Sequence, residues 1–68
     1  MNYLNERDFQ EYQEHLEIVA THLKTAHSFL IAEATHQNVL NNPTYAWRMK
    51  RMALAIDAII LANNLKDM

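Results

Sequence analysis

Apolar residues recur along the first half of the chain at alternating steps of three and four positions. The run comprises Phe9, Tyr12, Leu16, Val19, Leu23, Ala26 and Leu30. This spacing places the side chains in one seam along a helix, as in coiled coils and helical bundles. Asn5 is a suitable N-cap, and Asp8 lies where the acid of a capping box would lie. The pattern therefore predicts a helix over about residues 5–40.

The only proline divides the chain into two parts. Asn42 precedes Pro43, and a residue before proline is disfavoured in the helical region, whereas proline suits the first turn of a new helix. Asn42 can cap that helix, which we expect over about residues 43–65. Its apolar residues form two stripes. One stripe holds Tyr45, Met49, Met52, Ile56 and Ile59, and the other holds Trp47, Leu54, Ala58, Leu61, Leu65 and Met68.

The short connection predicts an all-α fold, an antiparallel helical hairpin that forms one domain over residues 1–68. We expect the first stripe to face the first helix, which leaves the second stripe and the early turns of the longer helix uncovered. A symmetric homodimer would cover both surfaces, so the sequence predicts a homodimeric four-helix arrangement. The residues expected in the core or the dimer interface are Leu16, Val19, Leu23, Leu30, Ile56, Ile60 and Leu61.

The hairpin also predicts two polar pairings. Folding the chain about Asn42 places Glu33 near Arg51 and His27 near Asp57. Both pairs combine an acidic with a basic side chain, so each would help to fix the register of the two helices.

Composition supports long helices and excludes several classes of protein. Glycine is absent, so we expect few positions with positive φ and no tight hairpins between strands. Cysteine is also absent, which excludes disulfides and thiolate metal sites and fits a reducing cytoplasm. The longest nearly apolar run, residues 52–62, is too short to span a bilayer. No signal peptide is evident, and we expect a cytoplasmic protein.

The four histidines do not have the spacing of a metal site. His15, His22 and His36 share one heptad position, and seven residues correspond to roughly 10 Å along a helix, too far for two side chains to bind one ion. No two histidines are three or four residues apart, and His27 lies on another face. We expect no metal and place these histidines at the edge of the dimer interface.

Catalysis is not expected either. Asp57 has no second acid or nucleophile near it in the sequence, and the chain has no glycine-rich loop and no nucleophile–base motif. These are the features by which an active site or a cofactor site is recognised. The sequence therefore predicts a protein that is not an enzyme and that binds no cofactor.

The segment TYAWRMKRM, residues 44–52, has the composition of a protein interface. Tyrosine, tryptophan and arginine dominate binding hot spots, so the predicted partner-binding residues are Tyr45, Trp47, Arg48 and Arg51. Cations near a helix N-terminus oppose the helix dipole, so we expect an acidic group of the first helix or of a partner beside them. The net charge of −2 and the lack of helix-turn-helix spacing argue against nucleic acid as the partner.

The size, the hairpin plan and the aromatic-rich start of the second helix, PTYAWR, resemble small phage-encoded host-takeover proteins of the anti-quorum-sensing anti-activator family. Members of that family are short helical-hairpin homodimers that bind and block bacterial proteins, including a LuxR-type transcription activator and a pilus-assembly ATPase. The resemblance implies an inhibitor in the host cytoplasm, with Tyr45, Trp47 and Arg48 contacting the target. A dimeric adaptor or regulatory protein is the alternative that the residues leave open.

Overall fold

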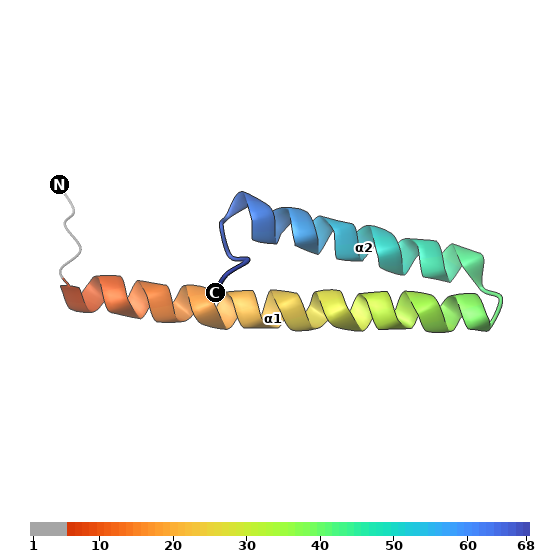
Figure 1. Cartoon of the computed structure of the whole chain (residues 1–68), viewed down its shortest axis with the longest axis horizontal. Coiled ribbons are helices and arrows are strands. Elements are labelled where there is room, and N and C mark those ends of the chain that lie inside the picture. The colour runs from red at the N-terminus through yellow and green to blue at the C-terminus, as the bar shows by residue number, and fades with distance from the viewer. Residues whose placement is uncertain (1–5) are drawn as a thin grey trace.

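The computed structural model describes residues 6–68 and contains two helices. Helix α1 spans Glu6–Val39, helix α2 spans Pro43–Ala62, and the two pack against each other as an antiparallel pair (Figure 1). No strand occurs within residues 6–68. The predicted all-α hairpin is therefore confirmed, although α2 ends three residues earlier than predicted. Asn5, the expected cap of the first helix, lies outside the described residues.

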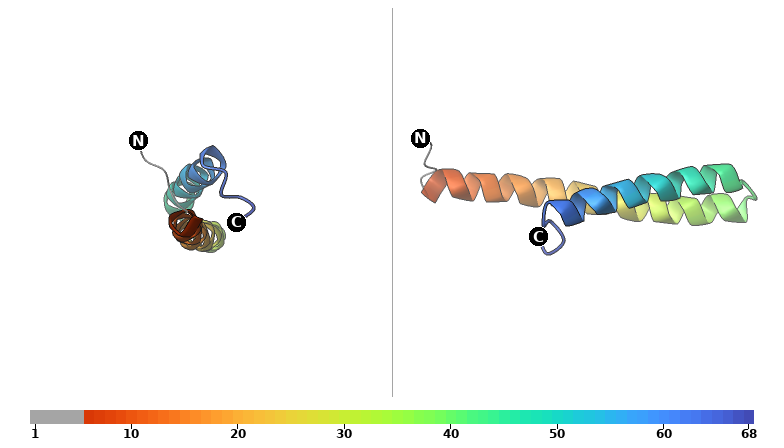
Figure 2. Two further views of the ribbon diagram at one scale, coloured as in Figure 1. Left: turned by 90° about the vertical axis from the view of Figure 1, so that its left-hand side faces the viewer. Right: turned by 90° about the horizontal axis from the view of Figure 1, so that it is seen from above.

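The hairpin is long and thin. Its principal extents are 55 × 17 × 15 Å and its radius of gyration is 16.3 Å, whereas a compact domain of this length has a radius of about 11 Å. The first turns of α1 project beyond both α2 and the C-terminal segment (Figures 1 and 2). The expected overhang of the longer helix is thus present, and much of α1 has no neighbour within the chain.

Helix α1 ends on a left-handed residue. Asn41 has a φ of 62°. Its N–H donates to the carbonyl of Asn38 at 3.0 Å, and the next N–H, of Asn42, donates to the carbonyl of Gln37 at 2.8 Å. These two bonds form a Schellman motif, which satisfies carbonyls that the end of a helix leaves open.

Helix α2 ends in the same way. Asn64 has a φ of 56°, and the N–H of Leu65 donates to the carbonyl of Ile60 at 2.9 Å. Positive φ is thus adopted at both helix ends although the chain has no glycine. Asparagine occupies these positions because its short polar side chain tolerates the left-handed region better than most residues do.

Asn42 occupies the N-cap position of α2 but does not cap the helix with its side chain. Its φ of −114° and ψ of 71° lie outside the helical region, as expected for a residue before proline. The side-chain Nδ2 donates instead to Oε1 of Gln37 at 3.1 Å. The predicted cap is therefore wrong, because Gln37 at the end of α1 binds the side chain that would have formed it.

The two helices meet along a narrow seam. On α1 the buried and half-buried residues include one heptad series, and α2 contributes a matching series. The seam residues are Gln13, Leu16, Ala20, Leu23, His27, Leu30, Ala34 and Gln37 of α1, and Ala46, Met49, Ala53, Ile56 and Ile60 of α2. Ala20 and Ala53 are 0% and 1% exposed. Alanine at these positions lets the backbones approach closely.

This seam is not the predicted one. In the predicted seam, Tyr12, Val19 and Ala26 alternate with the leucines of α1. In the structure, Gln13, Ala20 and His27 alternate with them instead. Tyr12 and Val19 are exposed. The helix is thus rotated so that Ala20 faces α2 in place of Val19, because a bulkier residue there would hold the two helices apart.

The predicted faces of α2 change for the same reason. Tyr45, Met52 and Ile59 were expected to face α1, but they are 60%, 39% and 47% exposed. Leu65 was expected on the outward stripe, yet it is 2% exposed and packs in a cluster with Ala20 and Ile60. It is buried because the chain turns back at Asn64 and returns to α1.

We expect Asn41→Gly to stabilise the protein. Glycine adopts positive φ without the steric cost that a Cβ imposes, so the free energy of unfolding should rise by about 0.5–1 kcal/mol. Thermal melting at a fixed concentration measures this as a rise of a few degrees. The matched control is Asn38→Gly, which lies within α1 and should lower the melting temperature. A fall with both substitutions would contradict the assigned role of Asn41.

Candidate protein-interaction surfaces

Large apolar side chains lie mostly outside the seam. Within residues 6–68, six apolar residues are buried and four of these are alanines. Fifteen large apolar residues are exposed in the same part of the chain. Scattered exposed apolar residues are normal, but contiguous apolar patches mark interaction sites. These fifteen residues therefore mark an interaction surface only where they lie side by side.

The seam divides the hairpin into two opposite faces. In a heptad series, the residue before each seam position lies on one flank and the residue after it lies on the other. Lys24, Ser28 and Asp57 each follow a seam residue, and all three line one hollow between the helices. Residues that follow the seam thus share one side of the hairpin, and residues that precede it share the other.

The first face is made of residues that precede the seam, and we name it the Val19–Met52 face. It is apolar on both helices, with histidines between the apolar residues of α1. Its members are Tyr12, His15, Val19, His22, Ala26, Phe29, Glu33 and His36 of α1, and Tyr45, Arg48, Met52, Ala55 and Ile59 of α2. Sequence reasoning missed the α2 part of this face because it assigned Tyr45, Met52 and Ile59 to the core.

The second face is made of residues that follow the seam, and we name it the Trp47–Leu54 face. Its α2 part is Trp47, Lys50, Leu54, Asp57 and Leu61, and its α1 part is mostly polar apart from Ile31. This face therefore combines a large apolar strip on one helix with charged and polar groups on the other. Such a mixture is typical of non-obligate interfaces, whose partners are also stable as separate proteins.

The four predicted partner-binding residues are divided between these faces. Tyr45 and Arg48 lie on the Val19–Met52 face, and Trp47 lies on the Trp47–Leu54 face. Arg51 lies between them on the outer side of α2 and stacks over Trp47, with Cζ 4.8 Å from the ring centroid. All four are exposed, so they form a continuous arc around the first turns of α2.

The basic residues at the start of α2 have no acidic partner among residues 6–68. The first turn of α2 contains no acidic residue, and within residues 6–68 no carboxylate forms an ion pair with Arg48, Lys50 or Arg51. The predicted pairing of Glu33 with Arg51 is wrong. Glu33 instead accepts a hydrogen bond from Nε2 of Gln37 at 3.1 Å.

The predicted proximity of His27 and Asp57 is found, but without a bond. Both line the hollow with Lys24 and Lys66, and no hydrogen bond or ion pair joins them in the described part of the chain. Nζ of Lys24 donates to the carbonyl oxygen of Met68, which ties the C-terminal segment to α1. The hollow is thus a structural junction between two helices and the returning chain.

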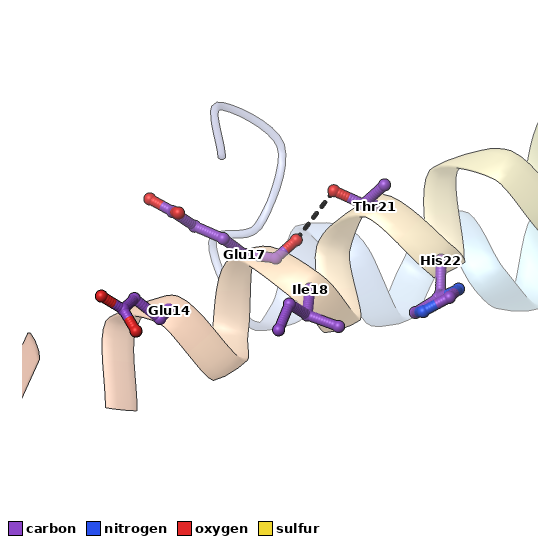
Figure 3. Close-up of a pocket in the computed structure, with 5 residues that line it drawn as sticks. All are labelled: Glu14, Glu17, Ile18, Thr21 and His22. Carbon is purple, nitrogen blue, oxygen red and sulfur yellow. Dashed lines mark hydrogen bonds between the residues drawn. The ribbon is translucent and has the colours of Figure 1, made fainter. Parts of the chain in front are cut away.

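A further hollow lies along α1 alone (Figure 3). Its residues are Glu14, Glu17, Ile18, Thr21 and His22, and its one internal hydrogen bond runs from Oγ1 of Thr21 to the carbonyl of Glu17 at 2.9 Å. A surface lined by a single helix holds no convergent set of reactive groups. Within residues 6–68, no three His, Cys, Asp or Glu side chains gather as a metal site would require.

The residues predicted for the core or the dimer interface fall into two groups. Ile60 is buried and packs with Leu16, Leu23 and Ile56, and Leu30 is half-buried in the seam. Val19 lies on the Val19–Met52 face and Leu61 on the Trp47–Leu54 face, and both are exposed in the hairpin. Their expected place in a dimer interface stays a prediction.

Comparisons with known proteins add no relative. No protein family, curated protein or solved structure matches the chain. Neither described helix is long and apolar enough to cross a membrane. The surfaces described above are therefore the basis for a functional argument.

We expect Trp47→Ala to leave the fold intact. Trp47 is 60% exposed, so its truncation should cost about 1 kcal/mol or less, mainly through loss of the contact with Arg51. Ile60→Ala is the comparison, because truncation of a buried isoleucine typically costs about 2–5 kcal/mol. Thermal melting of both variants distinguishes them. Equal losses of stability would place Trp47 in the core rather than at an interaction surface.

Proposed function

We propose that this protein is a non-enzymatic interaction module that acts as a homodimer and binds a further protein through Trp47 and its neighbours. The observation that carries this proposal is the number of large apolar side chains outside the seam. So small a chain buries little surface on folding and commonly depends on a partner for stability. The presence of two separate apolar faces supports the proposal that the chain has two separate partners.

The Val19–Met52 face suits self-association. Homodimer interfaces are more apolar than transient ones, and this face is the more apolar of the two on both helices. Packing it against its copy would complete a homodimeric four-helix arrangement. His15, His22 and His36 would then border the contact, where a histidine ring can present its apolar side to the neighbouring chain.

The Trp47–Leu54 face suits a different protein. Tryptophan and arginine are the residues that most often dominate binding hot spots, and the guanidinium of Arg51 over the Trp47 ring fixes the orientation of both. An acidic group on the partner would compensate Arg51 and Lys50. The polar α1 side of this face would supply the rim of the contact.

From the resemblance to phage anti-activators, we propose that this partner is a bacterial host protein, such as a quorum-sensing transcription activator or a pilus-assembly ATPase. In this reading the module blocks its target inside the host cell. The alternative is a dimeric adaptor or regulator that binds a product of its own operon. Both readings use the same face, so the identity of the captured partner distinguishes them.

The homodimer is tested by light scattering after size exclusion at micromolar concentration. We expect the wild-type chain to have twice the mass of the 8.0 kDa monomer. Ile59→Glu should weaken the dimer at least a hundredfold, because an unpaired buried charge costs several kcal/mol. Ile18→Glu is the matched control, since Ile18 is exposed but lies on neither face. A stable, cooperatively folded wild-type monomer would contradict the proposal.

Partner binding is tested by capture from bacterial lysate with wild-type, Trp47→Ala and Ile18→Ala chains. Loss of a hot-spot tryptophan weakens binding by at least about 2 kcal/mol, so Trp47→Ala should lose a protein that the other two chains retain. Recovery of a host regulator or ATPase supports an inhibitor, and recovery of an operon neighbour supports an adaptor. Recovery of nucleic acid alone would contradict both.

A further inference from the structure

The two ends of the hairpin carry opposite charge. The projecting start of α1, residues 6–15, has four acidic residues and one basic residue, a net charge of −3, and we call it the arm. The first ten residues of α2, residues 43–52, have three basic residues and no acidic one, a net charge of +3. The rest of the chain is nearly neutral. The molecule is therefore an elongated electric dipole.

These charges cannot compensate each other within one chain. The arm and the start of α2 lie at opposite ends of a molecule 55 Å long (Figure 1), several times the distance over which salt screens exposed charges. Acidic residues at the start of α1 are favourable beside the positive end of its helix dipole. The cations at the start of α2 lie near the positive end of the α2 dipole and form no ion pair within residues 6–68. An acidic group from another chain would therefore stabilise them.

We propose that the occupant of the Val19–Met52 face is a second copy of this chain in antiparallel orientation, with the arm of each copy beside the start of α2 of the other. The proposal rests on the homodimer proposed above and specifies its geometry. Arg48 lies on this face, so the acidic arm would pass directly beside it. Because the dimer has two-fold symmetry, the contact between opposite charges then occurs twice, once at each end.

The α1 part of the face is also complementary to itself when it runs antiparallel. Centred between His22 and Leu23, an antiparallel copy sets Tyr12 beside the partner's Glu33, where the phenol can donate to the carboxylate. It sets Val19 beside the partner's Ala26, so that a larger side chain meets a smaller one. Alternation of large and small residues across facing helices is what close packing requires.

Other symmetric arrangements oppose the charges. A parallel dimer places arm beside arm and the two basic segments side by side, so like charges face each other at both ends. A dimer joined only through its arms also brings acid against acid and leaves the basic segments exposed. Only the antiparallel overlap brings unlike ends together and covers the exposed Tyr12 of the arm.

Fluorescence energy transfer between singly labelled chains tests this geometry directly. The chain has no cysteine, so Gln10→Cys in the arm and Thr44→Cys at the start of α2 each provide one labelling site, and both positions are exposed. Donor and acceptor chains are mixed in three combinations. We expect strong transfer between position 10 and position 44, and weak transfer when both chains carry the label at the same position.

The outcomes separate the geometry from the dimer itself. Strong transfer between two labels at position 10 would overturn the antiparallel arrangement while leaving a homodimer. Absence of transfer in all three combinations, together with a monomeric mass, would overturn the homodimer as well. Light scattering on each labelled chain checks that the substitutions leave the oligomeric state unchanged.

Charge variants test the contact between the ends. Asp8→Lys, on the flank of the arm that continues the Val19–Met52 face, with its neighbour Glu11→Lys changes the net charge from −2 to +2, which keeps its magnitude, and should weaken the dimer about tenfold at low salt. Adding Arg48→Glu and Arg51→Glu to the same chain returns the net charge to −2 and should restore the affinity. Lack of weakening in the first variant, or lack of restoration in the second, would overturn the proposed contact.

Discussion

The close approach of α1 and α2 through alanine determines what the rest of this molecule can do. Ala20 and Ala34 on one helix and Ala46 and Ala53 on the other are all buried, and small side chains at such positions let two helices pack closely. A seam of this kind has little volume. Most of the large apolar side chains must therefore lie elsewhere, and the hairpin is left with two apolar faces instead of one central core.

The sequence was sufficient to predict the helices and the turn, because these depend on local signals. The proline after Asn42 and the regular spacing of apolar residues are visible without a structure. The rotation of each helix was not predictable by the same rule, since Leu16, Leu23 and Leu30 belong to both possible seams. Hydrophobicity favoured Val19 as the residue between Leu16 and Leu23 in the seam, whereas packing favoured Ala20, the small residue that follows it.

The candidate surface was predicted in composition but not in arrangement. The predicted partner-binding residues Tyr45, Trp47, Arg48 and Arg51 are all exposed at the start of α2. Their division between two faces follows from the position of the seam, which was predicted wrongly from the sequence. The seven-residue spacing of Ala46 and Ala53 was the signal that could have located it, because small residues at that interval indicate close helix contact.

The narrow seam also has a consequence for how such a protein can evolve. Each helix is constrained along one side only, where a larger side chain would force the pair apart. The remaining circumference contributes little to the packing of α1 against α2. A chain built in this way can acquire a new partner by substituting outward residues on an unchanged backbone, so its fold can persist in a lineage while its targets diverge.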